Sequence, residues 1–318
     1  MSKSNFLNVE GLTYCGKEAR DIMSQDVYSL DIRNYGITFL PNVKGKTKIH
    51  TGEISDLWQT YSCAFSPQGS ATLGEWFIEE TPIKINLEAC YSDFWDTYLV
   101  ESTEISLRGG IPAPFAEWYF AKFREKMKAE YQEIFWKGNT EYTGSTKAYL
   151  KVVDGVEKQL EEKGEKINGA AFTVDNILAQ VEAAINKDIE IAAAGGYGFD
   201  THKVFMNKYD VRLLQVALGK LCCGNSTNDR FSNYAKEGDK IYVMGMEIVP
   251  TEQSRNTIIV ANPKNLVLGF DVFDSHAEYK LIDMRDTTGD NMFRVLAISN
   301  IAVALVWPET IVYSRVAK

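Results

Sequence analysis

The stretch that decides the fold is N-T-I-I-V-A-N-P-K-N-L-V-L-G-F-D-V-F (256–273), which a polar connection joins to F-R-V-L-A-I-S-N-I-A-V-A-L-V-W-P-E-T-I-V-Y-S-R (293–315). β-Branched and aromatic residues run in short blocks between Asn-Pro, Gly and Asp-rich turns, which is typical of paired strands. No His, no Cys and no Ser in a nucleophile setting lies along these strands, and no phosphate-binding glycine loop precedes a helix. The pattern predicts a C-terminal segment that completes a β-sheet and contacts another surface. It predicts no catalytic residues in this segment.

Residues 36–90 predict a long antiparallel hairpin. Alternation favours strands at 57–65, 75–79 and 83–89, and S-P-Q-G (66–69) has the residues of a turn. The extended segment that precedes these strands has lysines at 44, 46 and 48, which share one of its faces. Because a lone two-stranded hairpin is marginal in water, we expect this one to need a partner.

The longest predicted helix follows Pro112 and Pro114 and ends at Gly138. Its apolar residues recur at three- and four-residue steps, which predicts one stripe facing a core. The stripe consists of Phe115, Tyr119, Phe123, Met127, Tyr131, Ile134 and Phe135. Two further helices are expected at 174–191 and after Asn207, and strands at 202–206 and 240–250.

Composition and charge exclude several classes of protein. The net charge of −9 argues against specific nucleic-acid binding, which needs a basic face. No signal peptide and no apolar run of membrane-spanning length is present, so we expect a soluble protein made in a cytoplasm. The five cysteines include no C-x-x-C pair, and the three histidines have no metal-like spacing, so we expect free thiols and no metal.

No candidate catalytic or binding group lies in a sequence context that supports such a role. The Gly cluster at 192–200 follows a helix, so it predicts a helix end instead of a phosphate loop. Asp283, Asp286 and Asp290 surround a turn whose spacing fits no calcium loop. The charged run at 157–166 is interpreted as a solvated face. The sequence predicts neither an enzyme nor a cofactor.

The order of these elements resembles the major capsid protein of tailed bacteriophages, the Hong Kong ninety-seven fold shared with encapsulins. The segment 83–99 looks like the strand that leaves the family's extended loop, and 114–138 looks like its spine helix. The segments 175–187 and 206–220 look like axial-domain helices, and 256–271 with 293–314 look like the closing strands. The resemblance implies an α+β fold with an N-terminal arm, an extended β-hairpin loop, a peripheral domain and an axial α/β domain.

The resemblance also implies a division of the chain and a set of contact residues. The expected parts are an arm (1–35), the extended loop with flanking strands (36–90), a peripheral domain (91–169, spine helix 114–137), an axial domain (170–255) and closing strands of both domains (256–318). In the family, the arm, the extended loop and the spine helix make inter-subunit contacts. The corresponding contact residues expected here are Phe65, Pro67, Gln68, Gly69, Trp76, Phe77, Arg124 and Lys128.

As a function, the resemblance implies a subunit that self-assembles as hexamers and pentamers into an icosahedral head shell around double-stranded DNA. The shell would be assembled in the host bacterial cytoplasm, with a separate scaffolding protein, a portal and decoration proteins as partners, and without a membrane. The acidic charge predicts weak, non-specific contact with the packaged DNA. No Lys lies between Leu57 and Ile83, so the Lys–Asn isopeptide bond of some family members is not expected.

Two other functions stay open at this point. An encapsulin-like compartment would keep the fold and enclose an enzyme instead of DNA. A cytosolic enzyme or small-ligand binder, with its site in 170–255, would form a small oligomer instead of shells.

Overall fold

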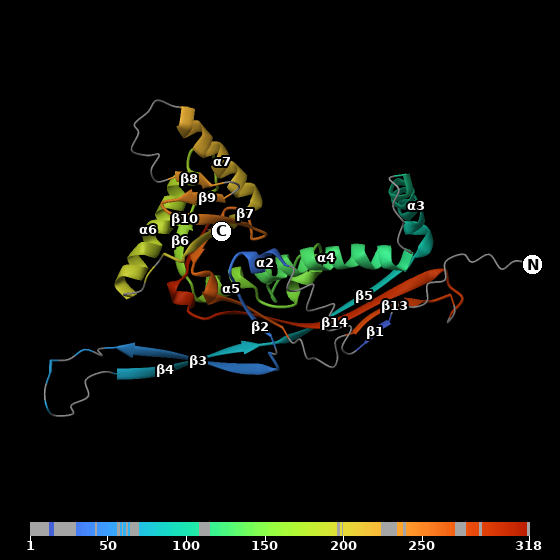
Figure 1. Cartoon of the computed structure of the whole chain (residues 1–318), viewed down its shortest axis with the longest axis horizontal. Coiled ribbons are helices and arrows are strands. Elements are labelled where there is room, and N and C mark those ends of the chain that lie inside the picture. Colours follow the sequence, from blue (N-terminus) through green and yellow to red (C-terminus); the bar gives the residue numbers. More distant parts are fainter. Residues whose placement is uncertain are drawn as a thin grey trace, which may run out of the picture.

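The structure is a computed structural model, and the residues that it describes fall into several stretches. They are 13–15, 30–41, 43–55, 58, 60–61, 63, 70–107, 115–195, 198, 200–223, 234–237, 240–270, 278–285 and 288–316. The described strands form two large sheets and one separate two-stranded hairpin. The molecule is elongated, with a long sheet along its base and a compact α/β body above one end (Figure 1).

The long sheet is built on β14 (Met292–Leu305), the longest strand among the described residues. β5 (Thr81–Cys90) pairs antiparallel with β14 from Met292 to Ile301, and β12 (Leu266–Phe270) pairs with its C-terminal end. The remaining strands are β13 (Glu278–Asp283) beside β14, β1 (Thr13–Cys15) beside β13, and β2 (Thr38–Pro41) beside β12. The parts of the quoted closing segments that form β12 and β14 therefore complete this sheet, as their strand pattern predicts.

The long helix is α4 (Phe115–Lys137), and it lies along the long sheet (Figure 1). Its predicted apolar stripe is buried or half-buried throughout, so this part of the prediction is confirmed. α3 (Tyr91–Leu107) precedes it and packs against its first turns through an aromatic cluster. In that cluster, the rings of Tyr119 and Phe293 lie 4.5 Å apart at 78°, a favourable edge-to-face contact.

The second sheet has the described strand order β6-β15-β11-β7-β10-β9-β8. Its strands are β6 (Glu165–Gly169), β15 (Val312–Val316), β11 (Thr257–Ala261), β7 (Lys203–Asn207), β10 (Met246–Thr251), β9 (Lys240–Val243) and β8 (Tyr234–Glu237). α6 (Ile177–Gly195) and α7 (Lys208–Cys223) pack on one face against Val204, Met206 and Ile258. Successive strand residues point to opposite faces, and Phe205 and Ile259 accordingly join a different cluster.

This other cluster joins the two sheets into one core. It contains Phe205 and Ile259 from the second sheet, Leu268 and Val303 from the long sheet, and the last turns of α4. α5 (Val156–Lys163) and α2 (Asp31–Asn34) also pack there. The described residues also include short 3₁₀ turns, which are η1 (Ala148–Lys151), η3 (Pro263–Asn265) and η4 (Pro308–Thr310). The C-terminal end of α4 is thus held between the sheets.

Several sequence-based boundaries are wrong. The segment 240–250 is two strands, because Met244 and Gly245 have φ of 51° and 82° and make a tight turn between β9 and β10. The charged run 157–166 is not uniformly solvated: it spans α5 and the start of β6, and Glu157 is buried. β5 ends at Cys90 and agrees with the strand expected at 83–89, whereas the second half of the segment 83–99 belongs to α3, which begins at Tyr91. The sequence of the N-terminal arm also favours a short helix near 17–24, and this segment lies outside the described residues.

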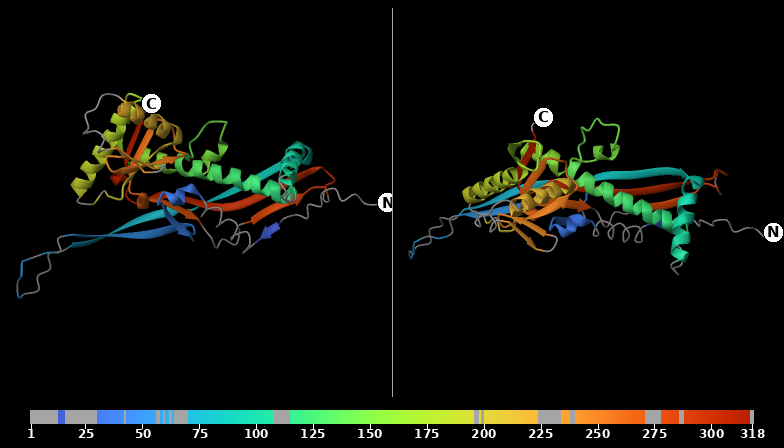
Figure 2. Two further views of the ribbon diagram at one scale, coloured as in Figure 1. Left: turned by 45° about the horizontal axis from the view of Figure 1, so that its top comes forward. Right: turned by 90° about the horizontal axis from the view of Figure 1, so that it is seen from above.

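The hairpin also differs from its prediction. Its strands are β3 (Lys46–Ser55) and β4 (Ser70–Glu79), so the expected strand at 57–65 is wrong where residues are described: Trp58, Tyr61 and Cys63 are not in strands. β4 continues almost directly into β5, with Glu80 between them. The hairpin projects from the end of the long sheet below the α/β body (Figures 1 and 2).

Candidate inter-subunit surfaces

The hairpin has one face turned to the body and one turned away from it. Directly paired residues share a face, so the register of β3 with β4 places Thr47 with Ile78 and Ile49 with Trp76 on one side. Ile78 is fully buried there and packs with Val43 and Val267. This contact anchors the base of the hairpin to β12 of the long sheet.

Gly269 of β12 makes the anchor possible. A Cβ atom added to Gly269 would lie 2.8 Å from Ile78 Cδ1 and 2.8 Å from Val43 Cγ2, closer than side chains approach one another. The absence of a side chain therefore lets the hairpin base sit directly on the strand.

The outer face of the hairpin carries apolar side chains among charges. Phe77 is half-exposed, and the Nζ atoms of Lys46 and Lys48 lie 4.7 Å and 5.9 Å from its ring centroid. Lys48 also pairs with Glu75 across the strands. Farther out, Leu73 is 79% exposed. Exposed apolar side chains on a projecting element favour a contact with another chain.

The predicted contact residues fall into three places. Phe65, Pro67, Gln68 and Gly69 lie outside the described residues. Trp76 and Phe77 are neighbours on opposite faces: Trp76 packs toward the body, and Phe77 points away from it.

Arg124 and Lys128 lie four residues apart on α4, both half-buried, so they belong to one face of a different element. The structure does not bring these two cations together with the hairpin residues. Lys46 and Lys48 do belong to the hairpin, so the absence of lysine holds only for the stretch 57–83 and not for the hairpin as a whole.

α3 is an exposed surface that the sequence reasoning missed. It stands at the far end of the long sheet from the hairpin (Figures 1 and 2). Leu99, Val100 and Ile105 are 41%, 61% and 41% exposed on it. The available signal was its composition, since Y-S-D-F-W-D-T-Y-L-V-E-S-T-E-I-S-L (91–107) has four acidic residues and no cation.

The inner side of α3 is fastened to α4 by polar contacts. Trp118 Nε1 donates to Glu101 Oε2 at 2.7 Å, and Lys122 Nζ lies 3.1 Å from Glu101 Oε1. The hydrogen bonds from Trp118 and Lys122 lower the pKa of Glu101.

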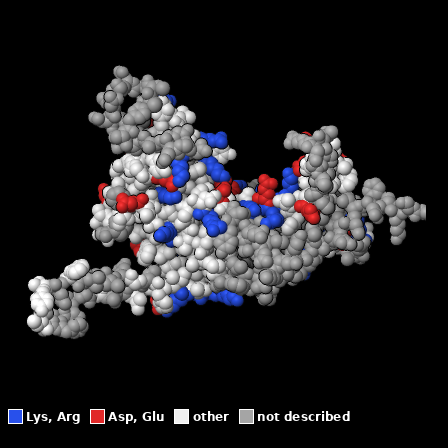
Figure 3. Space-filling view, viewed as in Figure 1, with Lys and Arg blue, Asp and Glu red and all other residues white. Residues whose placement is uncertain are grey.

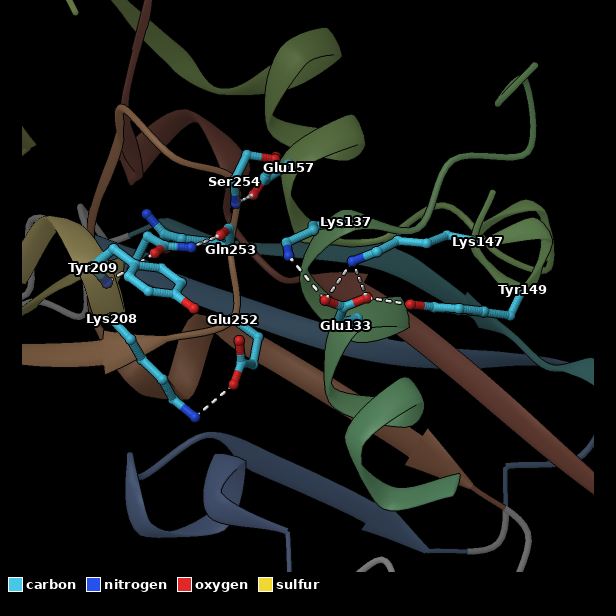
Figure 4. Close-up of polar contacts among 11 residues, drawn as sticks. Glu133, Lys137, Lys147, Tyr149, Glu157, Lys208, Tyr209, Glu252, Gln253 and Ser254 are labelled. Atoms are coloured by element: carbon cyan, nitrogen blue, oxygen red, sulfur yellow. Dashed lines mark hydrogen bonds and ion pairs between the residues drawn. The ribbon is translucent and has the colours of Figure 1, made fainter. Parts of the chain in front are cut away.

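Glu133 gathers a polar cluster at the C-terminal end of α4 (Figure 4). Lys147 Nζ donates to its two carboxylate oxygens at 2.8 Å and 2.9 Å, Tyr149 donates to Oε2, and Lys137 Nζ lies 3.3 Å from Oε1. Burial alone would raise the pKa of Glu133, but these donors and the two lysine charges overcome it and lower the pKa to about 2. The carboxylate is therefore an ionised anchor for the segment after α4.

Glu157 makes a second anchor, between α5 and the turn after β10 (Figure 4). Ser254 donates to it from its backbone N–H and from its hydroxyl, the latter at 2.6 Å. Burial raises the pKa of Glu157, and the two Ser254 donors act in the opposite direction. A buried carboxylate with two donors from one residue positions the loop that carries Ser254.

A further buried ionisable pair lies inside the α/β body. His202 Nδ1 lies 2.7 Å from Asp188 Oδ2, with both side chains buried between α6 and the start of β7. Within the described stretches, no three His, Cys, Asp or Glu side chains come together as metal ligands. Of the acidic turn patch, Asp283 pairs with Arg285 and Asp290 accepts from Thr288, while Asp286 is not described.

In the view of Figure 3, basic and acidic side chains are interspersed over the body, and basic side chains form a row along the lower edge. Among the described helices, none is long and apolar enough to cross a membrane. The projecting hairpin and α3 both expose apolar side chains, and α7 exposes Tyr209 and Val216 as well.

No family model matches the chain, and no curated protein is similar to it in sequence. Solved structures are similar in fold. One is a chain of the satellite phage P4 procapsid that includes the size determination (Sid) protein, 12% identical, with a TM-score of 0.59 over 94% of this chain and 91% of that chain. Another is from the capsid of Myoviridae phage XM1, 10% identical, with a TM-score of 0.53 over 91% of this chain and 92% of that chain.

A third similar structure is the capsid of the native GTA particle, 10% identical, with a TM-score of 0.52 over 91% of this chain and 90% of that chain. Sequence identities as low as these establish similarity of fold only. The chain has the α+β fold of these phage capsid proteins, and the fold class expected from the resemblance is confirmed.

Proposed function

We propose that this chain, which has the fold of phage capsid proteins, is the structural subunit of an icosahedral head shell that encloses double-stranded DNA. The observation that carries the proposal is the hairpin of β3 and β4. It is anchored at its base by Ile78 and carries Phe77 and Leu73 exposed on its outer face. A projecting hairpin without a core of its own gains stability by burying that face against another chain.

The placement of the exposed surfaces supports assembly in rings. The hairpin and α3 lie at opposite ends of the elongated molecule (Figure 1), so two different surfaces are available to two neighbours. Contacts between unlike surfaces generate closed rings when the rotation closes. We propose hexameric and pentameric capsomers held by such contacts, with Trp76 supporting Phe77 from behind and with Arg124 and Lys128 of α4 as a further contact.

We also propose how the chain is divided into functional parts and which other proteins it assembles with. The arm (1–35), extended loop (36–90), peripheral domain (91–169), axial domain (170–255) and closing strands (256–318) are proposed as the functional parts. A separate scaffolding protein, a portal and decoration proteins are proposed partners. The net charge of −9 supports weak, sequence-independent contact with the packaged DNA.

We propose that the chain is not an enzyme. The carboxylates of Glu133 and Glu157 are each occupied by hydrogen-bond donors of the chain itself, Lys147 for Glu133 and Ser254 for Glu157, which suits a structural role. An encapsulin-like compartment has the same kind of shell, and the contents of purified particles, DNA or protein, distinguish the two.

The hairpin contact is tested by Phe77→Asp, which places a charge at the centre of the outer face. We expect the monomer to fold, because Phe77 is half-exposed, and the concentration needed for assembly to rise about 10-fold or more, as for a contact of hot-spot strength. Sedimentation velocity measures the assembled fraction, and Phe77→Leu, which keeps an apolar side chain, is the matched control. Unchanged assembly of Phe77→Asp would reject the hairpin as a contact.

A further inference from the structure

The segment between α4 and α5 (139–155) is a closed surface loop. Gly155 N–H donates to Gly138 O at 2.9 Å, and Asn139 N–H donates to Leu150 O at 2.8 Å, so the loop returns to its own start. A Cβ atom on Gly155 would lie 2.7 Å from Gly138 N and 2.7 Å from Ile134 O, so the close approach requires glycine. Thr140 binds Asp154 through both its backbone N–H and its hydroxyl.

Contacts inside the loop fix its conformation. Tyr142 Oη donates to Thr146 O at 2.8 Å, and its ring fills the space beside Gly144. Lys147 has a φ of 63°, a left-handed conformation that a lysine adopts only when its surroundings impose it. Its ammonium group is held by both oxygens of Glu133 on α4. The loop is therefore prepared in one shape, which lowers the entropy cost of binding.

The tip of the loop is exposed and uncharged. Thr143, Ser145 and Thr146 are exposed, and Gly144 lies between them. The whole loop has two acidic and two basic residues, Glu141 and Asp154 against Lys147 and Lys151, so its net charge is zero. In both views of Figure 2 the loop, drawn in green after α4, stands out from the body.

We infer that the tip of this loop, residues 143–146, binds the same tip of a second copy across a two-fold axis. The inference rests on the proposed function and assigns a contact between capsomers, distinct from the contacts within a ring. At a two-fold axis each residue meets the same surface, so a charged patch faces its own charge. A rigid tip with hydroxyl groups and no charge can donate and accept hydrogen bonds with its own copy at no electrostatic cost.

The other exposed surfaces do not meet this condition. α3 has four acidic residues and no cation, so two copies of it would repel each other. The hairpin's outer face exposes Phe77 beside Lys46 and Lys48 and presents unlike groups that suit a different surface. Among the projecting elements described, the loop is the one whose charge balance favours self-contact.

The test uses charges of both signs at the tip. Thr143→Lys with Ser145→Lys places like charges across the two-fold axis, and Thr143→Glu with Ser145→Glu does the same with the opposite sign. We expect each double variant alone to form capsomer rings and to lower the fraction of chain in closed shells about ten-fold. Mixing the two purified variants brings opposite charges together and restores shells. Thr143→Ser with Ser145→Thr is the uncharged control, which keeps both hydroxyl groups and therefore keeps the shells.

Electron microscopy and sedimentation velocity read out rings and shells separately. Shells of either charged variant at the level of the unaltered chain would overturn the inference. A block in both variants that mixing does not relieve would overturn it as well, because the partner would then be another surface. If the unaltered chain forms neither rings nor shells, the proposed function itself fails, whereas intact rings with unaffected shells reject only the loop contact.

Discussion

Glu133 is the residue on which the end of α4 and the loop after it converge. Its carboxylate binds Lys147, Tyr149 and Lys137, and its pKa is lowered to about 2. A lowered pKa in the folded state means that the ionised form is favoured by folding. The stabilisation is present above the ordinary pKa of 4.5 and is lost as pH falls towards about 2.

Glu133→Gln is therefore expected to lower the free energy of unfolding by about 2 kcal/mol at pH 7, because a half-buried charged acceptor is lost. The deficit relative to the unaltered chain shrinks as the pH falls below 4.5. Urea denaturation over a pH series measures both effects. Glu141→Gln is the control, since the side chain of Glu141 is 76% exposed and its pair with Lys158 contributes little. Equal losses for the two variants, or a loss at pH 7 that persists unchanged at low pH, would contradict this role.

Glu157 shows what the sequence does not reveal at this scale. The run E-K-Q-L-E-E-K-G-E-K (157–166) favours a solvated face, yet Glu157 is buried. Its donors come from Ser254, 97 residues away in the chain. A local pattern contains no signal of so distant a partner. The start of the helix expected after Asn207 is by contrast a local signal, because the Asn207 side chain accepts from Tyr209 N–H in the first turn.

At the scale of elements, the base of the hairpin is fixed by close packing on β12. Gly269→Ala places a Cβ atom 2.8 Å from two buried methyl groups and 3.1 Å from Ala302 Cβ. We expect a loss of about 1–3 kcal/mol in the free energy of unfolding and faster hydrogen exchange in β4, because Ile78 must shift. Thermal unfolding and amide exchange measure these two effects.

Gly52→Ala is the matched control for this substitution. Gly52 lies in β3 of the same hairpin, and its added Cβ atom would meet only Leu73 Cδ2, at 3.9 Å. The control should be neutral or slightly stabilising, since alanine restricts the unfolded chain more than glycine does. A Gly269→Ala protein as stable as the control would show that the hairpin base is not closely packed.

The elements differ in how well the sequence predicts them. α4 was predicted within a residue at its C-terminal end, because helical periodicity and a glycine stop are local signals. The hairpin strands were displaced, since alternation identifies extended segments but not which residues pair. The split of 240–250 into β9 and β10 depends on a two-residue turn at Met244 and Gly245 that contains only one typical turn residue.

At the scale of the whole molecule, the element order indicated the fold better than any single motif did. The resemblance rested on an arm, a hairpin, a long helix, an α/β block and closing strands, and solved capsid structures share this fold over about nine-tenths of the chain. The exposed surface of α3 was missed because exposed side chains do not follow the core pattern. Surfaces that bind other copies do not shape the core pattern on which sequence reasoning relies.

The central claim is that the chain forms closed shells through contacts between its copies. Mass photometry with electron microscopy of the purified chain, alone and after co-expression with the proteins of its assembly pathway, tests it most directly. The account predicts rings of five and six copies and closed icosahedral particles that contain DNA when they mature. A chain that remains a monomer or a small oligomer at every concentration, and with every co-expressed partner, would contradict it.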